Sequence, residues 1–289
     1  MTAGTFDPIP TGTLYHYTSL EGLLGIVGSR TIRATHIAHL NDSAELNHAI
    51  ELLGHAVANN LSTADADERK CLEQLDEWLC HKFLLEHLLF TCSFTEVGNL
   101  LSQWRAYSPP SGGVSLGFNA EELLAAAGCQ EFQLTQCIYQ RSQQEALVND
   151  WLNAVMATRH DQEAPPSKRH PTQSYHGHFE SHEQRFLNVA ARLKHPTFAE
   201  EREWRLISKV GRDLRDPKLR FRAGKTRLIP YVEFMLPVRE SNSMSLDQVY
   251  IGPAQDHNLS FSAITAFLTN ASVRIARGTH ASGIPLRNW

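Results

Sequence analysis

The sequence lacks the features that would direct it to a membrane, to the outside of the cell or to nucleic acid. Among its 289 residues no apolar run approaches the roughly 18 that span a bilayer. Residues 1–8 carry neither the basic start nor the apolar stretch of a secretory signal. Lys and Arg number 27 against 31 Asp and Glu, so there is no overall basic excess of the kind that favours nucleic acid. These absences predict a cytoplasmic protein with no membrane partner.

Cysteine and the common catalytic signatures are scarce as well. The five cysteines are odd in number and form no CxxC pair, which predicts reduced, mostly packed thiols. There is no GxSxG, no HExxH, no Walker loop and no GxGxxG. Nucleophilic catalysis by Ser or Cys therefore has little support in the sequence.

What is present is the composition of a folded globular protein, with 42% hydrophobic and 20% charged residues. Strand-like and helix-like segments are mixed without a regular βαβ rhythm, which favours the α+β class. We expect a mixed, mainly antiparallel split β-sheet with flanking helices, in a single domain over residues 1–289. A helical insertion is expected at about 42–88, and an exposed Pro- and His-rich loop at about 160–177.

Local patterns predict the individual elements. Ser19 is expected to cap the helix that follows it, because a Ser hydroxyl accepts from a free helical N–H. The expected strands are 13–18, 31–37, 89–95, 114–118, 131–139, 204–208, 226–235, 247–251 and 272–276. The expected helices are 20–27, 43–60, 66–88, 100–107, 120–127, 142–158, 178–194 and 258–269.

Three of these strands carry polar side chains at alternate positions, which in a strand share one face. Each face alone is compatible with exposure to solvent, and the charged one with a surface ion-pair ladder. Together they predict one concave pocket, with all three faces on the same side of the sheet. The residues are His16 and Thr18 in the first strand, Ser93 and Thr95 in the second, and Glu201, Glu203 and Arg205 in the third.

The order His-Tyr-Thr (16–18), Ser-Phe-Thr (93–95) and Glu-x-Glu (201–203) resembles the three-part signature of ADP-ribosyltransferases. The resemblance implies an ADP-ribosyltransferase-like split sheet that takes NAD as its substrate. It also implies that His16 contacts a ribose, that Ser93 and Thr95 order the pocket, and that Glu203 is catalytic. Phe94 stands where that family has a central Thr.

Several longer stretches carry a second resemblance: Leu14–Leu23, His39–Asp42 with Glu45, Ser102–Tyr107 with Gly112 and Gly113, Glu201–Ile207, and Ile251–Pro253. Together they resemble a bacterial family known as domain of unknown function 2971. Members of that family are often found near phage-defence genes, which implies a toxin or effector role and a regulatory or defence-system partner. The acceptor of ADP-ribose stays open between protein, nucleic acid, small molecule and water.

Cleavage of the nicotinamide–ribose bond passes through an oxocarbenium-like state, which a nearby negative charge stabilises. We expect Glu203 to supply that charge and Glu201 to orient Glu203 or the target. Arg205 would favour the ionised carboxylates by Coulomb attraction. The change Glu203→Gln is expected to lower the rate by about 10²–10³ and to leave folding nearly unaffected.

The segment 100–107 offers further binding candidates. An aromatic ring of Tyr17, Trp104 or Tyr107 would stack on nicotinamide or adenine, although Trp104 also fits a core stripe with Leu100. Arg105 precedes a Gly-rich turn and is either a pyrophosphate contact or a structural ion pair.

A cluster of histidines raises the question of a metal. His176, His178 and His182 lie within seven residues, but their spacing is not that of HExxH, and no metal is expected. Two other functions stay open. One is a ligand-sensing or protein-interaction module without chemistry, and the other is a metal-dependent nuclease or phosphodiesterase.

Overall fold

The computed structural model describes residues 8–40, 44–82, 88–108, 112–160, 175–211, 213–237, 243–254 and 256–285. The strands are β1 (Thr13–Ser19), β2 (Thr31–His36), β3 (Phe90–Thr95), β4 (Gly113–Asn119), β5 (Phe132–Gln136), β6 (Glu203–Ser208), β7 (Arg220–Ala223), β8 (Leu228–Met235), β9 (Ser245–Leu246), β10 (Gln248–Ile251), β11 (Arg274–Ile275) and β12 (Thr279–Ala281). The α-helices are α1 (Leu20–Ser29), α2 (Ala44–Leu61), α3 (Ala66–Lys82), α4 (Leu101–Tyr107), α5 (Ala120–Cys129), α6 (Arg141–Ala157), α7 (His176–Ala190) and α8 (His257–Asn270). Two 3-10 helices are η1 (Ile37–His39) and η3 (Pro196–Glu201).

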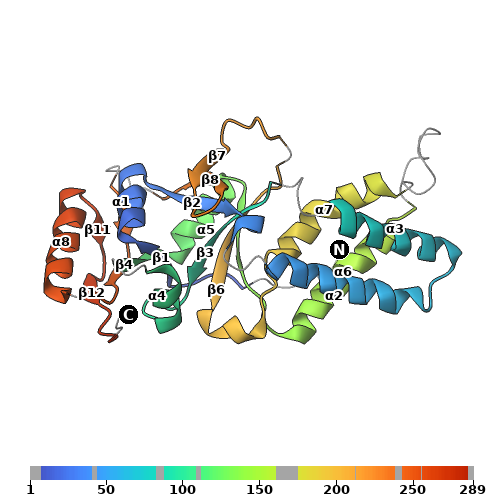
Figure 1. The fold of residues 1–289 in the computed structure, drawn as a ribbon, viewed down its shortest axis with the longest axis horizontal. Helices are drawn as coiled ribbons and strands as arrows, with labels where there is room; N and C mark the ends of the chain where they lie inside the picture. Colours follow the sequence, from blue (N-terminus) through green and yellow to red (C-terminus); the bar gives the residue numbers. More distant parts are fainter. Residues whose placement is uncertain are drawn as a thin grey trace.

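Ten of the described strands form one open sheet, and helices flank it (Figure 1). All pairings in this sheet are antiparallel except that of β10 with β12. This arrangement confirms the predicted α+β class with a mainly antiparallel sheet. The short strands β9 and β11 pair separately.

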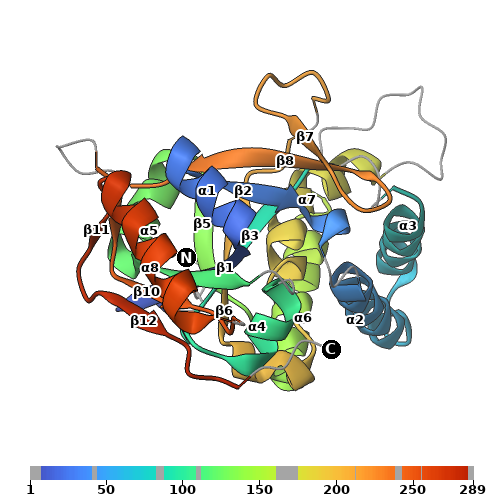
Figure 2. The ribbon, with the colours of Figure 1, turned by 60° about the vertical axis from the view of Figure 1, so that its left-hand side comes forward.

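The sheet divides at β3. One edge of β3 pairs along its whole length with β6, from Thr91 to Thr95. The other edge pairs with β2 only at Phe90 and Thr91 and with β1 only at Thr95. The strands β1 and β2 therefore diverge along that edge, and the residues between Thr91 and Thr95 face the gap without a strand partner there. The helix α1 joins β1 to β2 and lies between them in front of the sheet (Figure 2).

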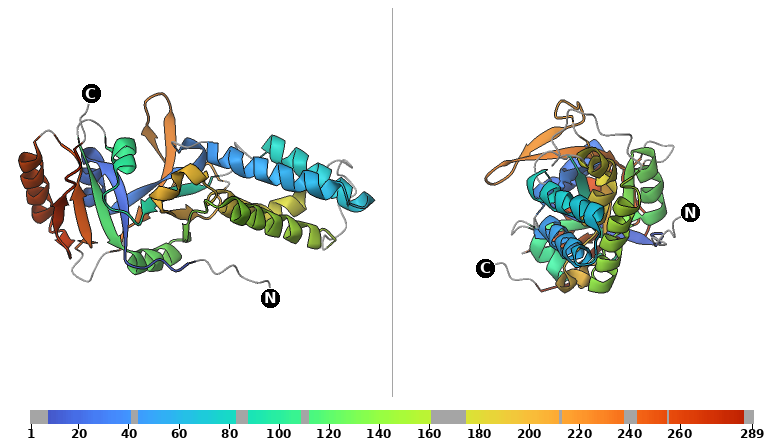
Figure 3. Two further views of the ribbon diagram at one scale, coloured as in Figure 1. Left: turned by 90° about the horizontal axis from the view of Figure 1, so that it is seen from below. Right: turned by 90° about the vertical axis from the view of Figure 1, so that its right-hand side faces the viewer.

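Among the described residues there are two large apolar clusters and a small third one of Tyr15, Tyr17 and Trp104. One of the large clusters lies on the sheet and includes Leu14, Phe94, Trp204 and residues of α1, α5 and α8. The other lies within the bundle of α2, α3, α6 and α7, which extends beyond one end of the sheet (Figure 3, left). Ile207 of β6 belongs to the bundle cluster, so the two parts share a strand.

The local signals explain most of the elements. The hydroxyl of Ser19 accepts from the backbone N–H of Gly22 at 3.0 Å, as the sequence predicts for a helix cap. The expectation that Glu201 belongs to the third strand is wrong. Glu201 ends η3, and Arg202 has a left-handed backbone with φ 42°, so the alternation of β6 begins only at Glu203. The strands β7 and β12 were not predicted, because each is short and partly exposed.

Several expectations fall partly or wholly on residues outside the description. Within 42–88 the structure shows α2 and α3, which lie side by side with α6 and α7. Within 160–177 it describes His160 and residues 175–177, and α7 begins at His176. Residues 161–174, Asn41, Asp42 and the side chain of Glu45 lie outside the description. The single domain stays a prediction.

Two sequence expectations concern absences. Cys71, Cys92 and Cys137 are buried and Cys129 is exposed, and all four are free thiols. None of the helices described is long and apolar enough to cross a bilayer.

Candidate functional site

A cavity of about 800 Å³ opens where β1 and β2 diverge from β3. Its walls come from α1, β1, β2 and β3, from Lys194 and β6, and from the ends of α4, β7 and β8. Nine of the sequence-predicted site residues line it: His16, Tyr17, Thr18, Ser93, Thr95, Tyr107, Glu201, Glu203 and Arg205. The gap in the sheet thus brings together side chains that are nearly 190 residues apart in the sequence.

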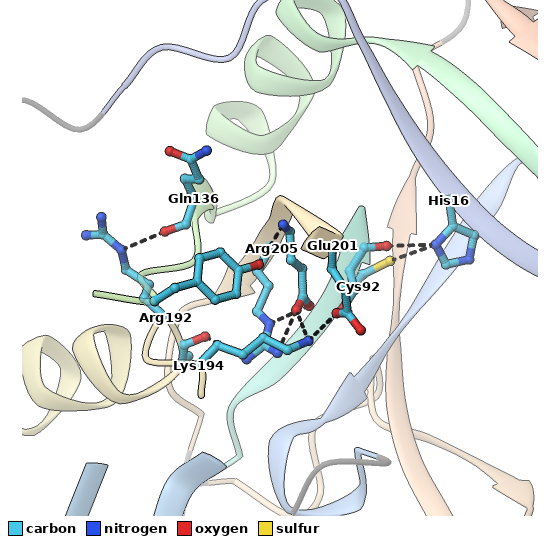
Figure 4. A network of polar contacts seen from close by, with 11 residues as sticks. His16, Cys92, Gln136, Arg192, Lys194, Glu201 and Arg205 are labelled. Carbon is cyan, nitrogen blue, oxygen red and sulfur yellow. Dashed lines mark hydrogen bonds and ion pairs between the residues drawn. The ribbon is translucent and has the colours of Figure 1, made fainter. Parts of the chain in front are cut away.

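His16 reaches across the gap from β1 to β3. Its Nδ1 lies 3.0 Å from the carbonyl oxygen of Ser93, and 3.8 Å from the sulfur of Cys92 (Figure 4). Because a carbonyl only accepts, Nδ1 carries the proton in the neutral ring and Nε2 is left as an acceptor. Burial lowers the pKa of His16, and the bond to Ser93 opposes this only in part. His16 is therefore a neutral imidazole near pH 7, suited to accept from a hydroxyl group.

The predicted common face is wrong for His16. Tyr15 of β1 stands opposite Thr95, and Thr95 stands opposite Glu203, so these three share one face of the sheet. His16 is the neighbour of Tyr15 in β1, so its side chain leaves the strand on the opposite face of the sheet. It lines the same cavity as Glu203 because the sheet is open between β1 and β2, and the cavity passes through the opening.

Glu203 lies at the centre of a buried charge network. Its carboxylate accepts from Lys194 at 2.5 Å and from Arg205 Nε at 2.7 Å and Nη2 at 3.1 Å (Figure 4). Its side chain is 5% exposed, and those of Lys194 and Arg205 are 3% exposed. The hydroxyl of Tyr139 accepts from the backbone N–H of Glu203 at 2.9 Å, and Arg205 also donates to the carbonyl of Ala191 at 2.8 Å. The network joins β6 to the segment that follows α7.

The charges of this network hold one another ionised. Burial alone would raise the pKa of Glu203, but the charges and hydrogen bonds of Arg205 and Lys194 lower it to about 2. Burial alone would lower the pKa of Lys194, and the Glu203 carboxylate raises it above the ordinary lysine value. Glu203 is therefore a carboxylate at every physiological pH, and its negative charge is compensated by two cations.

Glu201 approaches the same network from η3. Its carboxylate accepts from Lys194 at 2.6 Å, and its side chain is 14% exposed. The hydroxyl of Thr95 donates to the backbone carbonyl of Glu201 at 2.5 Å and so attaches the end of η3 to β3. Lys194 bridges the two carboxylates, which places both at the cavity wall.

The three aromatic candidates have different environments. Trp104 is fully buried, and its Nε1 donates to the side-chain oxygen of Asn99. Its ring meets that of Tyr17 edge-on, with the two ring centres 4.7 Å apart. It does not line the cavity, so its prediction as a stacking residue is wrong and the core alternative is correct. Tyr17 is 5% exposed, and its hydroxyl is held by Val97 and Leu100. Tyr107 is 37% exposed and lies at the cavity wall.

Arg105 lies on the exposed side of α4 and does not line the cavity. The expectation that it contacts a pyrophosphate there is wrong, because the helix directs Gln103 and Tyr107 to the cavity and Arg105 away from it.

The clustered histidines are used within the helix bundle. Nε2 of His178 lies 2.8 Å from the carbonyl of Val155, and Nε2 of His182 lies 3.0 Å from the hydroxyl of Thr158. Over the described residues there is no group of three or more His, Cys, Asp or Glu side chains that could hold a metal ion. The side chain of His176 lies outside the description.

Sequence reasoning missed several residues of the cavity region, among them Lys194, Tyr139, Arg33 and Arg222. Lys194 and Tyr139 carry no local signal, because a single buried Lys or Tyr becomes significant only through its tertiary partners. Arg33 and Arg222 also line the cavity. Arg33 was open to prediction, since it stands between the buried residues Ile32 and Ala34 in the same alternation that marks the other polar strands.

Comparison with known protein families gives one match. The model of the family described as "Protein of unknown function (DUF2971)" matches residues 103–206, which run from α4 to β6. This match supports the predicted family resemblance over those residues. No curated protein and no solved structure matches the chain.

Proposed function

We propose that the cavity between β1 and β2 binds NAD, and that the protein cleaves its nicotinamide–ribose bond and passes ADP-ribose to an acceptor or to water. One observation carries the proposal. An imidazole, a serine and two carboxylates from three distant segments line a single cavity at a gap in the sheet. The three short motifs that resemble the signature of ADP-ribosyltransferases lie on these same segments.

The dimensions of the cavity fit a ligand of this class. Its volume of about 800 Å³ lies within the range of roughly 300–1,000 Å³ that is usual for cofactor and small-molecule sites. Polar side chains of β1, β2, β3 and β6 line its length, as an elongated ligand with many hydroxyl and phosphate groups requires.

The binding roles follow from the geometry. Neutral His16 presents Nε2 as an acceptor for a ribose hydroxyl, because Nδ1 is used by Ser93. Tyr107, at the cavity wall, is the aromatic side chain proposed to stack on a nicotinamide or adenine base. Tyr17, Thr18 and Thr95 shape the wall behind them.

The reaction needs little covalent help from the protein. The C–N bond between ribose and nicotinamide breaks, nicotinamide leaves with the bonding electron pair, and an acceptor oxygen or nitrogen attacks the ribose carbon and releases a proton. The carboxylates of Glu201 and Glu203 would stabilise the positive charge that develops on the ribose. In this arrangement Glu203 holds Lys194 in place, and Glu201 is the more accessible of the two carboxylates.

A second candidate is a binding module without chemistry. Two observations favour it. His16 leaves β1 on the face of the sheet opposite Glu203, which counts against the arrangement expected of a transferase. Lys194 and Arg205 also compensate the charge of Glu203 and so reduce the negative potential that an oxocarbenium ion would meet. In that case the same cavity would hold its ligand without cleaving it. The metal-dependent nuclease alternative gains no support from the described residues.

The wider setting of the proposal rests on the family resemblance. It comprises a cytoplasmic toxin or effector, a role in phage defence, a macromolecular acceptor such as protein or nucleic acid, and a regulatory partner. Each of these is part of the proposal.

The test is nicotinamide release from NAD by the purified protein, measured by mass spectrometry. Glu201→Gln keeps the size of the side chain and removes its charge, so we expect turnover to fall by about 10²–10³-fold. Glu200→Gln is the matched control, because Glu200 is exposed in the same 3-10 helix and is not among the described residues that line the cavity. Its turnover should equal that of the native protein.

The outcomes separate the candidates. NAD binding without nicotinamide release in the native protein would favour the binding module. Turnover that is unchanged in a folded Glu201→Gln protein would remove this carboxylate from the reaction. Turnover that is abolished by a chelating agent would favour metal-dependent chemistry.

A further inference from the structure

The end of the cavity formed by β2, β7 and β8 carries an excess of positive charge. Arg33 of β2 and Arg222 of β7 both line it. Arg33 stands opposite Glu233 of β8, and Arg222 stands opposite Ile229 of β8. Ile229 and Glu233 are an even number of residues apart in this strand, so their side chains lie on the same face of the sheet. The two guanidinium groups therefore lie on one face of the sheet, on strands that flank β8.

The carboxylate that stands opposite Arg33 already has an ion-pair partner. Glu233 pairs with Arg220, Nε to Oε2, at 3.3 Å. Among the described residues neither Arg33 nor Arg222 has a carboxylate within 4.0 Å, the distance that defines an ion pair. Arg33 and Arg222 therefore line the cavity without an ion-pair partner among the described residues.

Other contacts show how the two arginines are held. The guanidinium of Arg33 lies over the ring of Tyr231, with its central carbon 5.1 Å from the ring centre, and this cation–π contact helps to hold the side chain in place. Burial lowers the pKa of Arg222, and the positive charge of Arg33 lowers it further.

A histidine adds a donor in the same region. His39 of η1 lines the cavity, and its Nδ1 has no hydrogen-bond partner among the described residues. Burial and the charge of Arg227, in the turn between β7 and β8, lower the pKa of His39. Figure 2 shows this turn beside the end of β2. The neutral ring carries one N–H, which suits a hydrogen bond to an anion.

We propose that Arg33 and Arg222, with His39 in the same cavity, form a diphosphate-binding subsite where β2 and β7 line the cavity. The inference rests on the proposed function, since a dinucleotide supplies the diphosphate, but the subsite itself requires only a phosphorylated ligand. Two guanidinium groups donate in pairs to phosphate oxygens, a geometry that a single lysine does not provide.

The test is a calorimetric titration with inorganic pyrophosphate, which involves neither NAD nor turnover. The native protein should bind pyrophosphate, and Arg222→Gln and Arg33→Gln should each weaken the binding at least tenfold, because each removes charge-assisted hydrogen bonds. Lys225→Gln is the control, since Lys225 is exposed in the same hairpin and is not among the described residues that line the cavity. Its affinity should stay within twofold of the native value.

Two results would overturn the proposal: no binding of pyrophosphate by the native protein, or unchanged binding in Arg222→Gln. Arg222→Gln decides the test if Arg33→Gln loses its fold, which a melting curve reveals, because Arg33 also packs on Tyr231. Weakened pyrophosphate binding in a protein that releases no nicotinamide would support the subsite and reject the enzymatic part of the proposed function. Nicotinamide release by the native protein, together with unchanged pyrophosphate binding in Arg222→Gln, would support the enzymatic function and reject the subsite.

Discussion

The carboxylate of Glu203 is enclosed with Lys194 and Arg205 in a place almost closed to water. Removing one partner of a buried ion pair leaves the other charges without compensation, and this costs more than the loss of an exposed pair. The expectation that Glu203→Gln leaves folding nearly unaffected is therefore revised. An amide of the same size can occupy the site, but it cannot neutralise the two cations.

We predict that Glu203→Gln lowers the free energy of unfolding at pH 7 by about 3–5 kcal/mol, the range for breaking a buried ion pair. The folded pKa of Glu203, about 2, lies below its unfolded value of 4.5. Its contribution is therefore complete above pH 4.5 and is lost as the pH falls towards 2; linkage puts it on the order of 3 kcal/mol.

Urea unfolding of the native and Glu203→Gln proteins at pH 7, 5 and 3 measures this contribution. The difference between the two proteins should shrink as the pH falls. Glu200→Gln, which changes an exposed carboxylate, should stay within about 0.5 kcal/mol of the native protein. A difference below 1 kcal/mol at pH 7 would show that Glu203 is not the structural centre of the network.

At the scale of elements, α1 connects the two strands that diverge, and its residues form one wall of the cavity. We predict that Ser19→Ala lowers the free energy of unfolding by about 1 kcal/mol, because the backbone N–H of Gly22 loses its acceptor. Chemical denaturation measures the effect. Ser262→Ala, in an exposed position within α8, is the control and should be neutral or slightly stabilising. Equal stability of Ser19→Ala and the native protein would show that the cap is dispensable.

At the scale of the whole molecule, one strand links two apolar clusters. Ile207 is 1% exposed and belongs to the bundle cluster, while its neighbours Trp204 and Leu206 on β6 belong to the sheet cluster. The same strand carries Glu203, which binds Lys194 beyond α7. The bundle and the sheet are thus joined by apolar contacts and by ion pairs on a single strand.

We predict that Ile207→Ala lowers the free energy of unfolding by about 2–5 kcal/mol. It should also reduce hydrogen-exchange protection in both α6 and β3. Leu72→Ala is the matched change within the bundle, where Leu72 is also 1% exposed. It should reduce protection in α6 more than in β3. Loss of protection confined to the helices in Ile207→Ala would show that the two clusters unfold independently.

Much of the fold follows from local chemistry in the sequence. The hydrophobic periodicity of α2, α3 and α6 predicts helices, and the hydroxyl of Ser19 predicts where α1 begins, because these signals act within a few residues. The alternation in β3 and β6 likewise identifies Ser93, Thr95 and Glu203 as a polar set before any partner is known.

Only the tertiary structure decides how those sets meet. Alternation fixes which residues of one strand share a face, but the face of the next strand depends on the pairing register, which distant core contacts determine. For this reason His16 starts from the face opposite Glu203 and reaches the cavity through the gap between β1 and β2. The charge of Glu203 is equally non-local, since Lys194, which lies outside its strand, changes it from a free carboxylate into a compensated one.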